Sequence, residues 1–302
     1  MRQIYKGKIT WVDITAPDEE DIKYLQKNYH FHPLILKELE TLSQRNKAEI
    51  YDNYLFLVTH FPNWDSQKQI SLPWEVDLII AQKYLITVSY DDSSEAHLEL
   101  KEKIYQKDFE HEYLSDTVKL LYFIFEHYLE FADRQITHIQ TKINNIEEQI
   151  FQHKQEEVIP QLSFVKRDIL NFRRIFNYLK EDLNSLNRKG KLLLGDDYKI
   201  YFDDLVGDSL KLDNVIDNFK DTLEALENTN NSFIEHKINI LTRIYTIISF
   251  MTLPTILVIS LYQTNTHYLP FVGSRYDTLI VLLIALTPSF LVYLYLRKKK
   301  LL

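Results

Sequence analysis

The stretch Asn239–Asn265, NILTRIYTIISFMTLPTILVISLYQTN, decides the class of this protein. From Ile244 to Tyr262 it carries no charged residue, and Ile, Leu, Thr, Ser and Phe dominate it. About nineteen residues at a rise of 1.5 Å per residue give a helix of roughly 28 Å, which is close to the hydrocarbon thickness of a bilayer. The stretch therefore predicts a membrane-spanning helix.

A second apolar run, Thr278–Leu296, follows after a short loop and predicts a second span. The tail 297–302 begins Arg-Lys-Lys-Lys, and the positive-inside rule places such a tail in the cytosol. With two spans, residues 1–243 share that side and only the loop 263–277 faces outward. The N-terminal residues lack the apolar core of a signal peptide. We therefore expect a multi-pass protein of the plasma membrane with both termini in the cytoplasm.

Composition excludes several classes of function. The chain of 302 residues has a formal net charge of −8 and no cysteine, so disulfides and thiolate metal sites are excluded. It has five glycines, and no Gly-rich phosphate loop follows any predicted strand. No nucleophile and base stand in a recognisable catalytic arrangement. We therefore expect neither an enzyme nor a prosthetic group, and no nucleic-acid partner.

Residues 1–112 predict a small mixed sheet with helices packed on it. Runs of β-branched and aromatic residues predict strands at Ile9–Ile14, Tyr54–His60, Val76–Ala81 and Tyr84–Tyr90. Acids after Pro17 suit the first turn of one helix, and proline at position 33 suits the start of another.

Residues 113–200 predict two long antiparallel helices packed on that domain. Apolar residues recur at three- and four-residue spacing from Leu120 to Ile150 and again from Leu162 to Leu183. Pro160 is the expected boundary between the two helices. The glycines at positions 190 and 195 are the expected end of the pair.

Residues 201–243 predict a stalk helix with a heptad seam. Leu212, Phe219, Leu226, Phe233 and Ile240 are spaced by seven, and the partner positions of the heptad are Ile216, Leu223, Asn230 and Ile244. Such a seam packs helix on helix, either within the chain or between copies of it. No glycine or proline interrupts residues 209–253, so we expect one helix to run from the stalk into the first span at 244–262.

The order of these pieces resembles the CorA-type divalent-cation channels, whose best-known members admit magnesium. The resemblance covers essentially the whole chain. The motifs that carry it are WVDITAPDEEDI (residues 11–22), HPLILKELE (32–40), YDNYLFLVTHFP (51–62), YLITVSYDD (84–92) and YFDDL (201–205). The long helix, two spans and a basic tail follow in the family's order. It implies an α+β membrane protein with a cytosolic α/β/α domain, a stalk helix and two C-terminal transmembrane helices. It also implies a funnel-shaped homopentamer whose axial pore is lined by the first span.

The outer end of the first span departs from the family pattern. The family's Tyr-Gly-Met-Asn is matched here by Tyr262, Gln263, Thr264 and Asn265. A small divalent ion holds its water tightly, so neutral oxygen acceptors suit selection of the hydrated ion. The resemblance implies that five copies of Asn265 form such a ring at the pore mouth, to which Thr264 and Gln263 add polar groups. The alternative for Asn265 is a simple turn residue after a helix end.

The resemblance also implies a pore face on the first span. Asn239 matches a pore asparagine at the inner end, and Leu253 matches an apolar constriction that gates by dewetting. Helical spacing puts Thr242, Ser249 and Ile256 on the same face, although Thr242 and Ile256 depart from the usual family residues. The alternative for Asn239 is a polar residue on an exposed helix turn, and the alternative for Leu253 is ordinary packing against lipid or other helices.

Acids gather at the start of the stalk. Asp204 matches a family aspartate that helps bind intracellular magnesium between protomers and so favours the closed state, and Asp203 and Asp208 lie beside it. Carboxylates from two chains repel each other unless a cation neutralises them, so such a site links ion concentration to subunit packing. The alternative is a solvated helix face.

These observations favour a homopentameric channel or transporter in the lipid bilayer that conducts divalent cations, with Mg²⁺ as the default substrate and a regulatory ligand. A second interpretation keeps the architecture but has the protein transport Zn²⁺, Co²⁺ or Ni²⁺, or export cations, because the motif at Gln263 and Thr264 is altered. A third is an oligomeric membrane scaffold or sensor that does not conduct.

Overall fold

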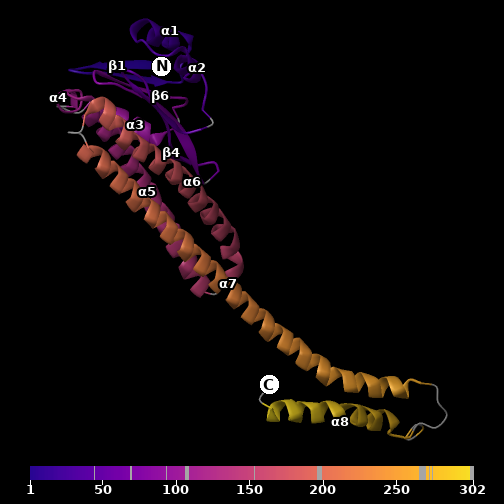
Figure 1. Ribbon diagram of the computed structural model, residues 1–302. Helices are drawn as coiled ribbons and strands as arrows, with labels where there is room; N and C mark the ends of the chain where they lie inside the picture. The colour runs from indigo at the N-terminus through magenta and orange to yellow at the C-terminus, as the bar shows by residue number, and fades with distance from the viewer. Residues whose placement is uncertain are drawn as a thin grey trace. The chain divides into compact units, whose positions relative to one another are not determined.

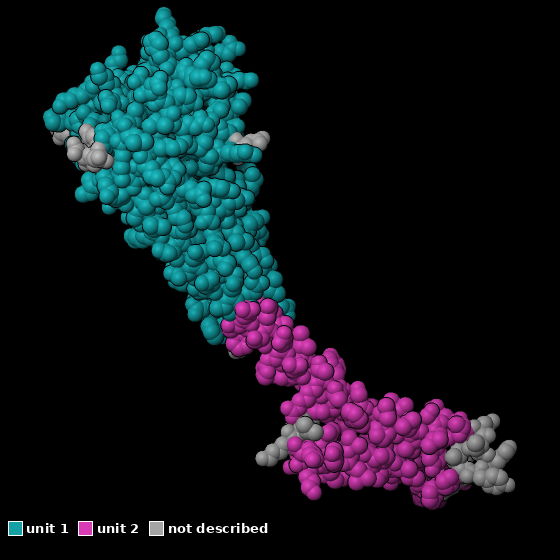
Figure 2. All heavy atoms as spheres, in the orientation of Figure 1, with its two compact units in different colours: residues 1–227 teal, residues 228–302 magenta. Residues whose placement is uncertain are grey.

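The computed structural model describes residues 1–43, 45–68, 70–92, 94–105, 109–152, 154–195, 199–264, 270–271, 273 and 275–299. The chain forms two compact units, Met1–Glu227 (unit 1) and Asn228–Leu302 (unit 2). Figure 2 colours the two units separately. The predicted cytosolic part and stalk correspond mostly to unit 1, and the predicted spans lie in unit 2.

Unit 1 is built on one sheet, which has six strands in the described residues, in the order β1-β2-β6-β5-β4-β3. The strands are β1 (Arg2–Lys6), β2 (Thr10–Thr15), β3 (Lys47–Ile50), β4 (Leu55–Asp65), β5 (Ile70–Ile80) and β6 (Tyr84–Ser89). Strands β2 and β6 pair in parallel, and the other neighbours are antiparallel. The sheet is therefore mixed, as the sequence predicts.

Two layers of helices cover the two faces of this sheet (Figure 1). Helices α1 (Glu19–Asn28) and α2 (Pro33–Glu38) pack on the face that carries Val12, Ile14 and Ile86. Alternate residues of β2 point to the opposite face, where Trp11 and Asp13 are also buried beneath α3 (Glu95–Ile104) and the long helices. This alternation produces the α/β/α layering.

The edge strands and the length of the central hairpin differ from the sequence predictions. Strands β1 and β3 were not predicted, because their short polar sequences, RQIYK and KAEI, carry little β signal. Strands β4 and β5 have 11 residues each, and Pro62 pairs opposite Pro73 in their ladder. Proline weakens a strand prediction, which is why the predicted runs stop short of these positions.

The two long helices also begin and end at other residues than predicted. After the short α4 (Phe109–Glu112), α5 runs Thr117–Phe151 and α6 runs Gln155–Leu194, so Pro160 lies inside α6 and is not the boundary. Gly190 does not end α6 either. A Cβ at Gly190 would stand 3.0 Å from the ring of Phe202, so the glycine permits close packing of α6 against α7. Helix α6 ends at Gly195, whose φ is +106°.

Helix α7 runs Lys199–Tyr262 without interruption and belongs to both units. In unit 1 its first part packs against α5 and α6 and buries Leu212, Ile216 and Leu223. Ion pairs from Lys166 to Glu227, Arg173 to Asp217 and Lys180 to Asp213 join α6 to α7. The heptad seam, for which the sequence left two partners open, is thus buried within the chain as far as Asn230.

Unit 2 contains the rest of α7 and helix α8 (Asp277–Lys298). In the described part of the chain, α7 and α8 are the two helices long and apolar enough to cross a membrane. Their apolar side chains are mostly exposed in the single chain, including Leu253 and Leu283. Lipid or other copies of the chain are the surroundings that such a surface requires.

Candidate ion pathway and acidic cluster

The five residues of the predicted pore face lie on one side of α7. Asn239 and Leu253 are fourteen residues apart, which at 3.6 residues per turn leaves them within about 40° of each other around the helix. Thr242, Ser249 and Ile256 fall in the same sector. All five are exposed in the single chain, and Leu253 and Ile256 are 59% and 60% exposed. The face therefore runs from polar to apolar along unbroken helix, and the described residues of the same chain leave it exposed.

The C-terminal end of α7, which the sequence predicts to be the outer end, continues as a tight turn. The Gln263 N–H donates to the carbonyls of Ile259 and Ser260 at 3.1 and 3.2 Å, and the Thr264 hydroxyl donates to the carbonyl of Leu261 at 2.6 Å. The Tyr262 hydroxyl approaches the Pro270 carbonyl at 3.4 Å. The Thr264 hydroxyl thus satisfies a carbonyl of the last helical turn. Asn265, the predicted filter residue, lies outside the described residues.

The two aspartates of the YFDDL motif contact different helices. Asp203 accepts from the Asn187 amide of α6 at 2.7 Å, and Lys199 lies 3.9 Å away. Asp204 accepts from the Tyr122 hydroxyl of α5 at 2.7 Å. Burial and the hydrogen bond to Asp204 both raise the pKa of Tyr122, so its hydroxyl remains a donor. The motif therefore ties the start of α7 to both long helices.

Further acids of α5 face this part of α7. Glu126, Glu130 and Asp133 line a cavity of about 100 Å³ together with Asp208 and Lys211 of α7. We call these four acids and Asp204 the acidic cluster. Although Asp208 is exposed, desolvation against α5 and the neighbouring charge of Asp204 raise the pKa of its carboxyl. Desolvation is also the main cause that raises the pKa of Glu126, with Glu130 and Asp204 adding to it.

The cluster brings the predicted Asp204 and Asp208 together but places Asp203 on the other side, against α6. The acids of α5 were missed by the sequence analysis. Their spacing, 126, 130 and 133, follows one face of a helix and would have indicated them once α5 was known to lie beside α7. Within the part of the chain that the structure describes, no three His, Cys, Asp or Glu side chains converge closely enough to hold a metal ion.

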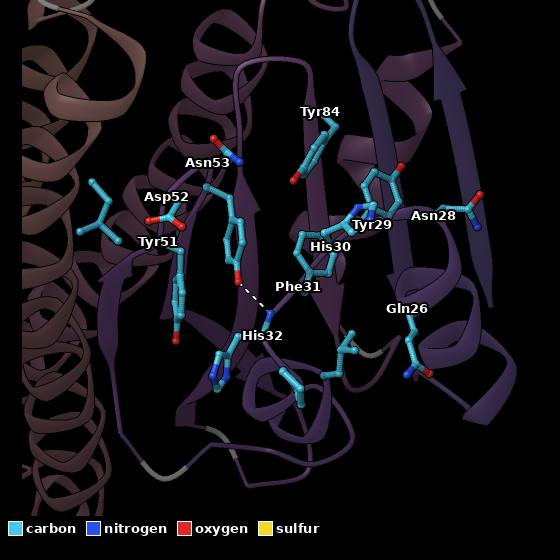
Figure 3. A pocket seen from close by; sticks show the side chains of 14 residues that line it. Gln26, Asn28, Tyr29, His30, Phe31, His32, Tyr51, Asp52, Asn53 and Tyr84 are labelled. Carbon is cyan, nitrogen blue, oxygen red and sulfur yellow. Dashed lines mark hydrogen bonds between the residues drawn. The ribbon is translucent and has the colours of Figure 1, made fainter.

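Unit 1 also carries a groove of different chemistry, about 920 Å³ in volume, between the α1–α2 loop and the β3–β4 turn (Figure 3). Aromatic rings dominate its lining: Tyr29, Phe31, Tyr51, Tyr54 and Tyr84. The His32 N–H donates to the Tyr54 hydroxyl at 3.0 Å. Burial raises the pKa of Tyr29, Tyr51 and Tyr84 to about 12, so these hydroxyls stay neutral.

The groove has one carboxylate in its lining, Asp52. A hard divalent cation prefers several oxygen ligands, carboxylates among them. The polar face of α7 and the acidic cluster therefore fit a divalent cation better than this groove does.

Comparison with known proteins decides the family. A family model described as "CorA-like Mg2+ transporter protein" matches residues 6–298. The chain belongs to this family. A cobalt/magnesium transport protein CorA of Thermotoga maritima is 23% identical over 96% of this chain and 83% of its own length. A putative metal ion transporter, YfjQ of Bacillus subtilis, is 22% identical over 90% of this chain and 83% of its own.

Solved structures agree on the fold. The complete CorA magnesium transporter of Methanocaldococcus jannaschii superposes with a TM-score of 0.82 at 18% identity, covering 96% of this chain and 90% of that one. The full-length CmaX protein gives a TM-score of 0.72 at 14% identity, with 96% and 88% covered. The chain thus has the CorA fold, an α/β domain with a long helix and C-terminal apolar helices, and it belongs to a family of membrane transporters for divalent metal ions. The roles of the individual site residues remain predictions.

Proposed function

We propose that this chain forms a homopentameric channel of the plasma membrane through which divalent cations pass, with Mg²⁺ as the default ion. The observation that carries the proposal is the face of α7 from Asn239 to Ile256. It is polar at its inner end, apolar around Leu253, and exposed over its whole length in a single chain. Copies of the chain around an axis would give these side chains partners and enclose a path for ions.

In this proposal the spans are residues 244–262 and 278–296, the loop 263–277 faces outward, and the remaining residues lie in the cytoplasm. Asn265 of each copy forms a ring of neutral oxygens that binds the hydrated ion, because Mg²⁺ gives up its water reluctantly. Leu253 forms an apolar neck that closes by dewetting. The Thr264 hydroxyl donates its proton to the Leu261 carbonyl, and its oxygen can still accept a hydrogen bond from a water of the hydrated ion.

The acidic cluster supports feedback by the cation. Glu126 and Asp208 have raised pKa values, in part because other carboxylates surround them, and this repulsion weakens when a cation binds. Among the described residues, the acids of the cluster do not converge closely enough to hold a metal ion, so we propose that a second copy adds further oxygens. High cytosolic Mg²⁺ would then hold copies together in the closed state.

The experiment is uptake of Mg²⁺ and Co²⁺ into proteoliposomes by the wild type and by Asn265→Ala, with Asn145→Ala as a control on an exposed face of α5. We expect the wild type and Asn145→Ala to carry Mg²⁺ and Asn265→Ala to lose most of the flux. Equal flux in protein-free and protein-bearing vesicles for every divalent ion would overturn conduction and leave the scaffold interpretation.

A second candidate, transport of another divalent cation or in the outward direction, is favoured by Gln263 and Thr264, which stand where the family pattern has glycine and methionine. The same vesicles distinguish it. Flux of Co²⁺, Zn²⁺ or Ni²⁺ well above that of Mg²⁺ would replace Mg²⁺ as the substrate.

A further inference from the structure

Each apolar helix of unit 2 contains a proline that is followed at once by a hydroxyl residue. The pairs are Pro254-Thr255 in α7 and Pro288-Ser289 in α8. A proline inside a helix has no N–H to donate to the carbonyl four residues earlier, and its ring displaces that carbonyl. Each helix is therefore least constrained by its own hydrogen bonds at the level of its proline.

The two hydroxyls meet at this level. The Oγ1 atom of Thr255 and the Oγ atom of Ser289 are 2.6 Å apart. The Thr255 hydroxyl also lies 3.2 Å from the Ala285 carbonyl of α8, and the Ser289 hydroxyl donates to the Met251 carbonyl of α7. Each hydroxyl thus reaches the carbonyl four residues before its partner. We call Thr255, Ser289 and these two carbonyls the hydroxyl clamp.

Proton counting shows how the clamp holds. Each hydroxyl carries one proton, so two hydrogen bonds exist at a time, running either from Thr255 through Ser289 to Met251 or from Ser289 through Thr255 to Ala285. Either arrangement links the helices through a relay of two bonds. Ala285 is 1% exposed, and its small side chain permits the close approach.

The packing beside the clamp is open on one side. A cavity of about 470 Å³ begins at Thr255 and Ala285 and extends between the helices toward Tyr262 and Asp277. The helices are therefore loosely packed on the outer side of the clamp. Hydrogen bonds between helices are a recognised source of cohesion in bilayers, where apolar contact with lipid competes with contact between helices.

Thr255 lies two residues after Leu253, which places the two side chains about 160° apart around α7. The clamp thus fixes α7 from the side opposite Leu253, at the level where Pro254 has no N–H to donate to the carbonyl four residues earlier. We propose that Thr255 and Ser289 are positioning residues that hold Leu253 in the neck of the pore. This inference rests on the proposed function, since it takes Leu253 as the gate.

The way in which the neck closes determines whether loss of the clamp raises or lowers the Mg²⁺ flux. A neck that closes by dewetting conducts whenever it widens, so freedom gained at Leu253 raises the flux. Loss of one interhelical hydrogen bond in a membrane changes an equilibrium by about threefold. We therefore expect Thr255→Val and Ser289→Ala each to raise the Mg²⁺ flux per protein about threefold, and the double variant to raise it about tenfold.

Two neighbouring threonines provide matched controls. The Thr252 hydroxyl donates to the Ile248 carbonyl of its own helix, and the Thr287 hydroxyl donates to the Leu283 carbonyl of its own helix at 2.8 Å. Thr252→Val and Thr287→Val remove hydroxyls beside the same prolines without touching the clamp, and we expect wild-type flux from both. The conservative Thr255→Ser keeps the hydroxyl and should also keep the wild-type flux.

The controls separate the possible failures. A wild type that carries no cation would overturn the proposed function and this inference with it. A conducting wild type, with Thr255→Val and Ser289→Ala equal to the two controls, would overturn the clamp alone. Reduced flux with a lower melting temperature would show a merely structural role and would also overturn it.

A cysteine pair gives a second measurement. The chain has no cysteine, so Thr255→Cys with Ser289→Cys introduces the sole thiols. Oxygen atoms 2.6 Å apart indicate positions that a disulfide can join. We expect mild oxidation to block thiol labelling and to lower the Mg²⁺ flux, and a reductant to restore both. Thiols that remain free, or a flux unchanged by oxidation, would overturn the proposal.

Discussion

Two parts of helix α7 can be compared directly, residues 199–227 in unit 1 and residues 228–262 in unit 2. In the first part, Ile216 and Leu223 are 1% and 2% exposed, because α5 and α6 cover the seam. In the second part, Ile240 and Ile244 are both 47% exposed, although the same heptad continues through them. One apolar pattern therefore serves two purposes. It completes a domain in the first part, and it leaves a surface for lipid or other copies in the second.

The largest expected effect tests this contrast with one substitution in each part. Ile216→Ala removes a fully buried side chain and should lower the free energy of unfolding by about 2–5 kcal/mol. Ile240→Ala should cost about 1 kcal/mol or less, since its surface is largely uncovered. Unfolding of the detergent-solubilised full-length protein measures both. An equal loss at Ile240 would mean that contacts between copies bury the second part as completely as α5 and α6 bury the first.

The next expected effect is the pH dependence of stability caused by a buried carboxyl of unit 1. Burial raises the pKa of Asp182 on α6 from its ordinary 3.8 to about 7, against hydrogen bonds from Asn46 and Thr59 and the charge of His60, which lower it. The folded state therefore keeps a proton that the unfolded state loses above about pH 4. The contribution of Asp182 to stability is therefore highest below about pH 4 and falls as pH rises toward 7, by about 2–4 kcal/mol.

Asp182→Asn removes this titration and keeps an oxygen acceptor for Asn46. We expect the stability of the variant, relative to the wild type, to increase from pH 5 to pH 8 and to level off above. Unfolding at several pH values measures it, and Asp221→Asn, at an exposed acid, is the control. Parallel profiles for the wild type and Asp182→Asn would show that Asp182 does not carry the pH dependence.

Elements that depend on local periodicity and composition could be predicted from the sequence. Helix ends that depend on contacts between distant residues could not. The strands β2, β4, β5 and β6, the long helices and the two apolar helices follow from local patterns. Pro160 and Gly190 mislead because each usually ends a helix. Gly190 instead makes room for Phe202, a contact from a residue twelve positions away that no local pattern contains.

The candidate sites also combine residues that the sequence could indicate with residues that only the packing of helices brings together. Asp204 could be indicated by resemblance and Asp208 as an acid close to it in the sequence, but Glu126 joins them only because α5 packs beside α7. The clamp between Thr255 and Ser289 likewise depends on how two helices meet, and neither residue stood out in the sequence. Tyr262 ends α7, Gln263 and Thr264 lie in the turn after it, and the role of all three in selecting ions stays a prediction.

A smaller effect concerns cation binding at the start of α7. Asp204→Asn removes one charge from the acidic cluster and should raise the Mg²⁺ concentration needed for protection against proteolysis about fivefold to tenfold, a change of about 1–1.4 kcal/mol. Asp221→Asn, which removes an acid from the same helix away from the cluster, should leave the midpoint unchanged. An unchanged digestion pattern in Asp204→Asn would argue that the cluster is only a solvated face.

The smallest effects concern the ion pairs that join α6 to the first part of α7. Arg173 and Asp217 pair at 2.9 Å with side chains 41% and 48% exposed, so Arg173→Gln should cost about 0–1 kcal/mol, and less in high salt. Lys180 pairs at 2.8 Å with Asp213, whose side chain is only 12% exposed. Lys180→Gln should therefore cost more than Arg173→Gln and respond less to salt, because the carboxylate left behind is poorly solvated. Equal, fully salt-sensitive losses in thermal unfolding would show that buried apolar side chains, and not these charges, hold α7 against α6.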